Sequence, residues 1–267
     1  MALKDAFFSE KKRYFTAIAL LILLFVVVWI DSVFLTWLVL GIFFLLGFNE
    51  ALGLFECQKS YKKLVFPAIL WIFSFFVQNP IELGIFFLML LSGFLAYKKS
   101  FKPQYIYVFI YPTIPFLALL SLYKNFGLRS VIFLIIVIAI CDTMAYFGGK
   151  VLGKTPLSPT SPKKTIEGVI VGVATAICIG SLLGIGMLSL HFLKAIFVSF
   201  VVALSGVLGD LFESFLKRRI DIKDSGSILP GHGGVLDRFD AILFGAIALA
   251  FLLQFFSKED PSAFLIF

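Results

Sequence analysis

The sequence has few of the residues that stabilise or serve a water-soluble domain. Only 15% of its 267 residues are charged, only two are histidines, and its three cysteines, Cys57, Cys141 and Cys178, are scattered. An odd number of scattered cysteines argues against a disulfide framework. The chain also lacks an internal repeat and a low-complexity linker. The scattered cysteines exclude a disulfide-stabilised secreted domain.

Apolar residues are what the chain has in excess. Hydrophobic residues make up 60% of it and the mean hydropathy is +1.03, whereas soluble domains are about 45–50% apolar. A single water-soluble core cannot contain that excess. The composition therefore predicts an all-α, polytopic bundle of helices integral to a membrane.

Windows of about 17–25 mostly apolar residues, the length that crosses a bilayer, predict nine spans. They cover residues 14–30, 33–48, 64–78, 81–97, 105–123, 129–149, 168–187, 190–212 and 240–257. Pro112 and Pro115 are expected to kink the fifth. The first follows a basic stretch, as a signal peptide would, but its length and the lack of a cleavage site favour a retained span. We divide the chain into a five-span region, residues 1–125, and a four-span catalytic region, residues 126–267.

The distribution of basic residues predicts the orientation. With a cytoplasmic N-terminus, 19 of the 23 Lys and Arg residues fall in cytoplasmic segments, and only Lys124, Arg129, Lys194 and Lys258 fall outside. This asymmetry follows the positive-inside rule and favours an N-in, C-out topology. It also accounts for the net charge of +7, because no aromatic–basic pattern typical of a nucleic-acid partner occurs. In a bacterium the protein would lie in the inner membrane.

Acids occur where apolar spans should exclude them. Asp210, Glu213, Ser214 and Lys217 recur at i, i+3, i+4 and i+7, so they share one face of a helix. Asp142 and Tyr146 share a face of the sixth span in the same way. Acids within membrane spans are costly and usually face a cavity or a partner. Either a functional site or a set of interfacial ion pairs would explain the stripe.

Two polar loops, residues 150–167 and 217–239, are separated by two spans and so should face the same side. The first carries Lys163, Lys164 and Thr165 just before a span. Two lysines, a hydroxyl and the free N–H groups of a helix N-terminus can hold a polyphosphate. The alternative is that these lysines only follow the positive-inside rule.

The second loop combines cations, acids and glycines. Lys217, Arg218, Arg219, Lys223 and Arg238 supply the positive charges, and Asp221, Asp224, Asp237 and Asp240 supply the negative ones. One histidine and no cysteine argue against zinc, whereas carboxylates with few nitrogens suit Mg²⁺ with phosphates completing its shell. Acids for a metal beside bases for phosphate are typical of phosphoryl or nucleotidyl transfer.

The segment SFLKRRIDIKDSGSILPGHGGVLDRFD, residues 214–240, closely resembles the signature of phosphatidate cytidylyltransferases, also called CDP-diacylglycerol synthases. CDTMAYFGGK and SPKKTIEG resemble two other blocks of that family. The matching part runs from about Asp142 to Asp240. The resemblance implies a membrane enzyme that joins CTP to phosphatidic acid and uses Mg²⁺. A second cation and a homodimer are left open. Two alternatives remain: a CTP-dependent enzyme acting on another lipid such as a polyprenol, and a membrane transporter.

On this resemblance we expect three groups of site residues. Catalytic roles are expected of Ser214, Lys217, Arg218, Lys223, Asp224, His232 and Arg238, contacts with CTP of Asp142, Tyr146, Lys163, Lys164, Thr165, Gly233 and Gly234, and metal coordination of Asp210, Asp237 and Asp240. For His232 we favour donation to a phosphate over a general base, a metal ligand or a purely structural turn residue.

Overall fold

The computed structural model describes residues 2–57, 60–99 and 102–259. The helices are α1 (Ala2–Ile30), α2 (Val33–Leu54), the 3-10 turn η1 (Tyr61–Leu64), α3 (Val65–Ser74), α4 (Pro80–Tyr97), α5 (Pro103–Leu152), α6 (Ile166–Leu188), α7 (Phe192–Arg219) and α8 (Leu236–Glu259). A hairpin of β1 (Pro156–Ser158) and β2 (Ser161–Thr165) joins α5 to α6. The region predicted as residues 126–267 therefore extends beyond the described residues.

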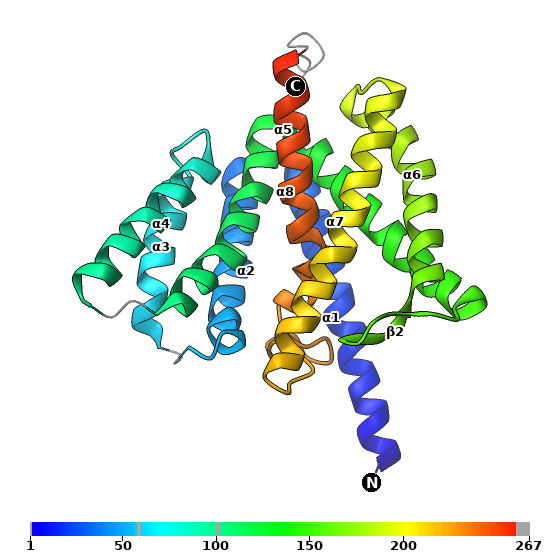
Figure 1. The fold of residues 1–267 in the computed structure, drawn as a ribbon, viewed down its shortest axis with the longest axis horizontal. Coiled ribbons are helices and arrows are strands. Elements are labelled where there is room, and N and C mark those ends of the chain that lie inside the picture. Colours follow the sequence, from blue (N-terminus) through cyan, green and yellow to red (C-terminus); the bar gives the residue numbers. More distant parts are fainter. Residues whose placement is uncertain (1, 58–59, 100–101, 260–267) are drawn as a thin grey trace.

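The helices form one bundle, with α3 and α4 beside α2 on one flank and α6 on the other (Figure 1). Among the described residues six helices, α2 and α4 to α8, are long and apolar enough to cross a membrane. The apolar part of α1, Tyr14–Ile30, is shorter, and α3 has ten residues. The all-α membrane bundle is confirmed, while the count of nine spans stays a prediction.

The fifth and sixth predicted spans both lie in α5, which is bent rather than continuous. Its backbone leaves helical geometry at Tyr111, directly before Pro112, and at Gly127, where φ is +71°. Proline removes a helical hydrogen bond, and glycine adopts positive φ without steric strain. The boundary predicted between residues 125 and 126 lies beside the second bend.

Lys124, predicted to lie in a loop between spans, lies inside α5. Its ammonium group donates to the backbone carbonyls of Ser74 and Phe75 at the end of α3, at 3.2 and 3.0 Å. The last carbonyls of a helix have no partner within the helix and favour a cation. Lys124 thus ties the short α3 to the bend of α5.

Small residues let α6 lie directly against the second half of α5. A Cβ added to Gly172 would lie 2.5 Å from the backbone oxygen of Cys141 and 2.8 Å from Ala145. Such close contact between backbones is the usual way in which membrane helices associate, because lipid supplies no hydrophobic force between them. This packing fixes the position of the hairpin that precedes α6.

The hairpin, the loop between α7 and α8, and the N-terminus lie at one end of the bundle, and α8 ends at the other (Figure 1). The predicted placement of the two polar loops on one side is therefore confirmed. Residues 150–167 were predicted to form a polar loop, and the prolines and serines in it gave no sign of regular structure, whereas the structure places the β1–β2 hairpin there. Which side is cytoplasmic stays a prediction.

Candidate active site

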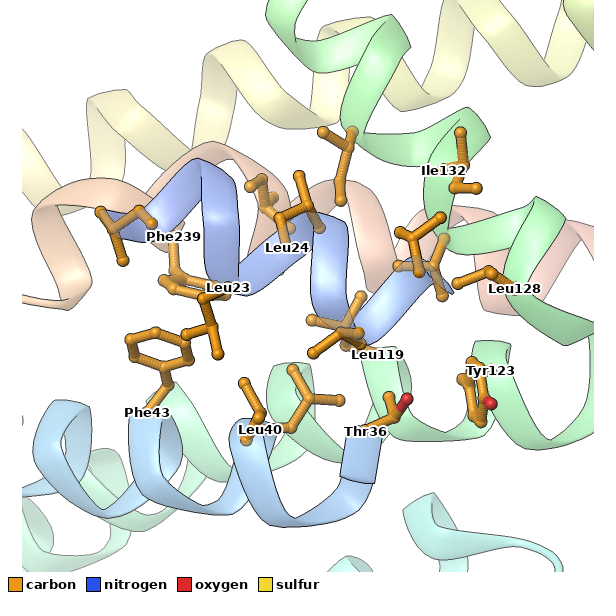
Figure 2. A pocket seen from close by; sticks show the side chains of 17 residues that line it. Leu23, Leu24, Thr36, Leu40, Phe43, Leu119, Tyr123, Leu128, Ile132 and Phe239 are labelled. Atoms are coloured by element: carbon orange, nitrogen blue, oxygen red, sulfur yellow. The ribbon is translucent and has the colours of Figure 1, made fainter. Parts of the chain in front are cut away.

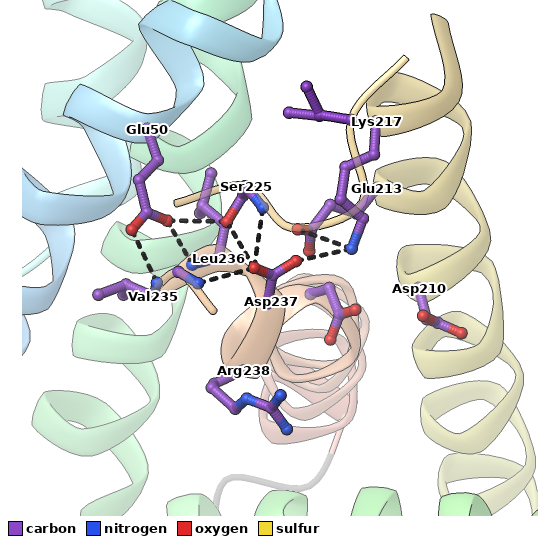
Figure 3. A network of polar contacts seen from close by, with 12 residues as sticks. Glu50, Asp210, Glu213, Lys217, Ser225, Val235, Leu236, Asp237 and Arg238 are labelled. Atoms are coloured by element: carbon purple, nitrogen blue, oxygen red, sulfur yellow. Dashed lines mark hydrogen bonds and ion pairs between the residues drawn. The ribbon is translucent and has the colours of Figure 1, made fainter. Parts of the chain in front are cut away.

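Lys217 lies at the centre of a cluster of acids where the C-terminal turns of α7 meet the start of α8. Its ammonium nitrogen is 2.7 Å from Asp237 Oδ1 and 3.3 Å from Glu213 Oε1 (Figure 3). Glu213 precedes Lys217 by four residues, so the helix brings them together. The side chains of Glu213 and Asp237 are 0% and 6% exposed. This ion-paired cluster therefore has little contact with solvent.

Asp237 also organises the loop between α7 and α8. Its second carboxylate oxygen accepts hydrogen bonds from the backbone N–H groups of Ser225 and Gly234, at 2.8 and 2.7 Å, and from the Ser225 hydroxyl. Gly233 has φ +85°, and a Cβ there would lie 2.6 Å from that same oxygen. The glycines of the signature therefore let the loop close around a carboxylate. They were expected instead to let backbone approach CTP, and this function for them stays a prediction.

Glu50, which the sequence analysis missed, holds the same loop from α2. Its carboxylate accepts hydrogen bonds from the backbone N–H groups of Val235 and Leu236 and from the Ser225 hydroxyl, each at 2.9 Å (Figure 3). Glu50 is 1% exposed. An acid is favoured at a helix N-terminus because the first N–H groups have no partner there. Glu50 therefore joins the N-terminal helices to the loop between α7 and α8.

The predicted second span ended at residue 48, which placed Glu50 in a loop. In the structure α2 continues to Leu54 because the residues after Glu50 are apolar, and Leu52 and Leu54 are buried. A lone acid between two apolar stretches was the available signal. Glu213 was recognised as part of the polar stripe but was not expected to be a site residue.

The acid cluster has the composition of a site for a hard cation. Glu213, Asp237 and Asp240 interact electrostatically with the ammonium group of Lys217, and Lys164 also acts on Asp240. The buried oxygens of Glu213 accept no hydrogen bond from the described residues. A buried carboxylate without donors is costly unless a cation compensates it. Among the described residues, however, no three possible ligands are close enough together to hold a metal ion.

A second ion pair links the hairpin to α7. Lys164, on β2, contacts the carboxylate of Asp210, so Asp210 lies apart from the network around Asp237 (Figure 3). Asp142, on α5, is close enough to Lys164 and Asp240 to interact electrostatically with both. Thr165 caps α6, since its hydroxyl accepts a hydrogen bond from the Gly168 N–H. The predicted polyphosphate loop is thus placed beside the acids of α7.

Most of the other predicted residues are exposed. Arg218 and Arg238 are exposed and donate to the backbone carbonyls of Ile222 and His232, respectively. Lys163, Lys223 and Asp224 are exposed, Ser214 and His232 are half-buried, and Tyr146 is 65% exposed. Only Lys217 among the predicted cations enters the acid cluster. The remaining ones stand at the edge, where a soluble ligand can reach them.

Comparison with known proteins identifies the family to which this arrangement belongs. Residues 11–256 match the Cytidylyltransferase family. The chain belongs to the cytidylyltransferase family. A phosphatidate cytidylyltransferase of Helicobacter pylori is 46% identical over 253 residues, which cover 95% of both chains. One of Bacillus subtilis is 34% identical over 239 residues, 78% of this chain and 86% of its own.

The cytidylyltransferase match extends well beyond the segment on which the resemblance was based. The resemblance seen in the sequence covered only about residues 142–240, and residues 1–125 resembled the family only as an apolar region of several spans. The match begins at residue 11 and includes α2, the helix that carries Glu50. The N-terminal helices are therefore part of the family fold, and α2 holds the loop between α7 and α8.

An apolar cavity of about 250 Å³ lies beneath α1, between α2, α5 and α8 (Figure 2). Its side chains are apolar except for Thr36 and Tyr123, and Phe239 of α8 contributes to the wall. Phe239 lies between Asp237 and Asp240 in sequence but packs on Phe43 and Phe116, away from the acids. The apolar lining of this cavity can contact hydrocarbon chains but offers no charged group to a triphosphate, which must bind elsewhere.

Proposed function

We propose that the protein transfers the cytidylyl group of CTP to phosphatidate. A phosphate oxygen of phosphatidate attacks the α-phosphorus of CTP, a new P–O bond forms, and the bond to the bridging oxygen of the β-phosphate breaks. The products are CDP-diacylglycerol and pyrophosphate. The observation that carries this proposal is the buried acid–lysine cluster at one end of an otherwise apolar bundle, where a water-soluble nucleotide and a lipid phosphate can meet. The names of the relatives support the same reaction.

Lys217 is the residue we place at the reacting phosphates. Among the described residues it is the cation that pairs with both Glu213 and Asp237, and its ammonium group can turn from the carboxylates to a phosphate oxygen without leaving the cluster. A positive charge in a buried site stabilises developing negative charge more strongly than it would in water. Holding the two substrates in line would supply much of the remaining rate.

Mg²⁺ can be held by one or two carboxylates with substrate phosphates completing its shell. Asp237 and Asp240 would supply such carboxylates beside Lys217, whereas Asp210, which pairs with Lys164, lies apart from them. When bound, the ion would neutralise nucleotide oxygens and the departing pyrophosphate. Removal of divalent ions with EDTA should therefore abolish activity, and added Mg²⁺ should restore it. A second cation stays an expectation.

The substrates approach from different directions. We assign the triphosphate to the hairpin, with Lys163, Lys164 and the capped N-terminus of α6, because an anion is favoured at such a helix end. The lipid phosphate is assigned to the exposed cations around the loop, Arg218, Lys223 and Arg238. We further propose that this end faces the cytoplasm, in a bacterium from the inner membrane, and that the protein forms a homodimer.

One assay separates the alternatives. Purified protein in mixed micelles receives CTP with phosphatidate or with a polyprenol, and pyrophosphate release and lipid-bound cytidine are measured. Release that requires phosphatidate and yields CDP-diacylglycerol is the expected result. Release with polyprenol alone would identify a different lipid substrate, and no release with either lipid would contradict the transferase.

A further inference from the structure

A cavity on the far side of α2 is not explained by cytidylyl transfer. It lies between α2, α3, α4 and α5 and has a volume of about 760 Å³, against about 250 Å³ for the cavity beneath α1. Phe48 and Leu52 of α2 line it, together with apolar residues of α3, α4 and α5. Each lies two residues from Glu50, roughly 200° around the helix. The cavity and the catalytic loop therefore contact opposite faces of α2.

The charged side chains that line this cavity are both cationic. Lys63, Lys98 and Tyr105 line it, and no acid does so among the described residues. Lys63 Nζ is 3.1 Å from the Tyr105 hydroxyl and lies over its ring, 4.8 Å from the centroid. Lys98 lies 4.6 Å over the ring of Phe94. Both lysines therefore border apolar surface, and the cavity carries two formal positive charges.

These two lysines lie at one end of the cavity, where the chain leaves the apolar helices. Lys63 is in η1, just before α3, and Lys98 directly follows α4. The start of α3 and the end of α4 lie at the end of the bundle that also carries the catalytic loop (Figure 1). Lysines at the ends of membrane helices sit at headgroup depth, so the cavity is apolar in the hydrocarbon region and cationic at the membrane surface.

We propose that this cavity binds one anionic glycerophospholipid, with its acyl chains between α2, α4 and α5 and its phosphate at Lys63 and Lys98. A soluble anion would make no contact with the apolar wall, and a neutral lipid would offer no negative charge to the two lysines. The proposal requires only that the chain spans a bilayer and does not depend on the transfer reaction. The lipid could be phosphatidate, stored near the catalytic loop, or a bulk anionic phospholipid.

Native mass spectrometry of the purified protein tests this proposal. The protein is released from nanodiscs of phosphatidylcholine that contain either phosphatidylglycerol or phosphatidate, and retained lipids are counted. The K63Q/K98Q variant should retain about tenfold less anionic lipid, since each lysine near a membrane surface contributes a sizeable attraction. The control variant K62Q/K99Q makes the same charge change on exposed neighbours that do not line the cavity, and it should retain wild-type levels.

A second variant tests the hydrocarbon part of the cavity. Leu91→Trp fills it from α4 while leaving both lysines in place, and it should also lose the retained lipid. Loss in both nanodisc types would identify a general anionic site, and loss confined to phosphatidate would identify a site for that lipid. Wild-type retention by K63Q/K98Q in both nanodisc types, or by Leu91→Trp, would overturn the proposal. Thermal melting of each variant confirms that it is folded.

Discussion

At the scale of single residues, Lys217 compensates more charge than any other side chain described above. It contacts Glu213 and Asp237 and interacts electrostatically with Asp240. Removing one partner of a buried ion pair typically costs about 3–5 kcal/mol, because the remaining charge stays buried. A lysine in this position therefore affects both the reaction and the stability of the fold.

Lys217→Met should lower kcat by about a thousandfold or more, because charge on the reacting phosphates loses its compensation. It should also lower the melting temperature, since the acids are left facing one another. Arg219→Met is the control: Arg219 makes an exposed contact of 3.8 Å with Glu56, and exposed pairs contribute about 0–1 kcal/mol. Steady-state kinetics and thermal melting measure both effects. Near-normal kcat in Lys217→Met would remove Lys217 from the reaction.

Glu50→Gln tests whether the anchor on α2 positions the catalytic loop. The amide keeps the shape, but its NH₂ group must face an N–H or hydroxyl donor, which leaves a buried donor unsatisfied at a cost of about 1–3 kcal/mol. We expect kcat to fall about tenfold to a hundredfold with little change in the KM for CTP, because the hairpin lysines are unaffected. Glu56→Gln, an exposed acid beyond the end of the same helix, should behave as wild type. A change confined to the KM for CTP would contradict this positioning role.

The prediction for His232 follows from its position between Gly231 and Gly233 in the loop between α7 and α8. We expect His232→Gln, which preserves a donor, to keep measurable activity with little change in the pH profile of kcat. His232→Ala should lose more. Equal loss in both variants, together with a wild-type titration near about pH 6–7, would instead indicate a general base.

At the scale of elements, the contact between α5 and α6 determines where the hairpin lies. Gly172→Ala would place a methyl group against the backbone of α5, and overpacking of this kind costs about 1–3 kcal/mol. Because α6 carries the hairpin at its start, the KM for CTP should rise as well. Gly186→Ala, near the other end of α6, is a matched control, since a Cβ there meets nothing within 4 Å. Equal melting temperatures for the two variants would contradict this prediction, because α5 would then accommodate the added methyl group without a loss of stability.

The sequence predicted the elements that depend on local pattern. Apolar runs located the helices, and the spacing of Glu213 and Lys217 placed them on one face of α7. The hairpin was missed because prolines and serines mark an irregular segment without fixing its shape. The continuation of α2 to Leu54 was missed because Glu50 interrupts the apolar run. Glu50 was missed for a different reason: its partners are 175 to 186 residues away, and no local pattern reveals such a contact.

At the scale of the whole molecule, the two polar loops lie at one end of the bundle, and labelling can test which side of the membrane that is. Single cysteines at Pro159 and Ser227, both exposed, are introduced after the native cysteines are replaced. Ser227 is preferred to Ser225, which is buried. In intact cells neither should react with an impermeant maleimide until the membrane is opened. Labelling of either from outside would reverse the predicted orientation.

The long-range hydrogen bonds of Glu50 have a consequence for how the protein is made. α2 leaves the ribosome before α8, and Leu236 follows Glu50 186 residues later, which takes on the order of 10–40 s at ribosomal rates of synthesis. During that interval the carboxylate has none of its final partners and must remain in contact with water at the membrane surface. α8 brings those partners, so we expect a nascent chain that stalls before α8 to hold an unformed loop and to consume no CTP.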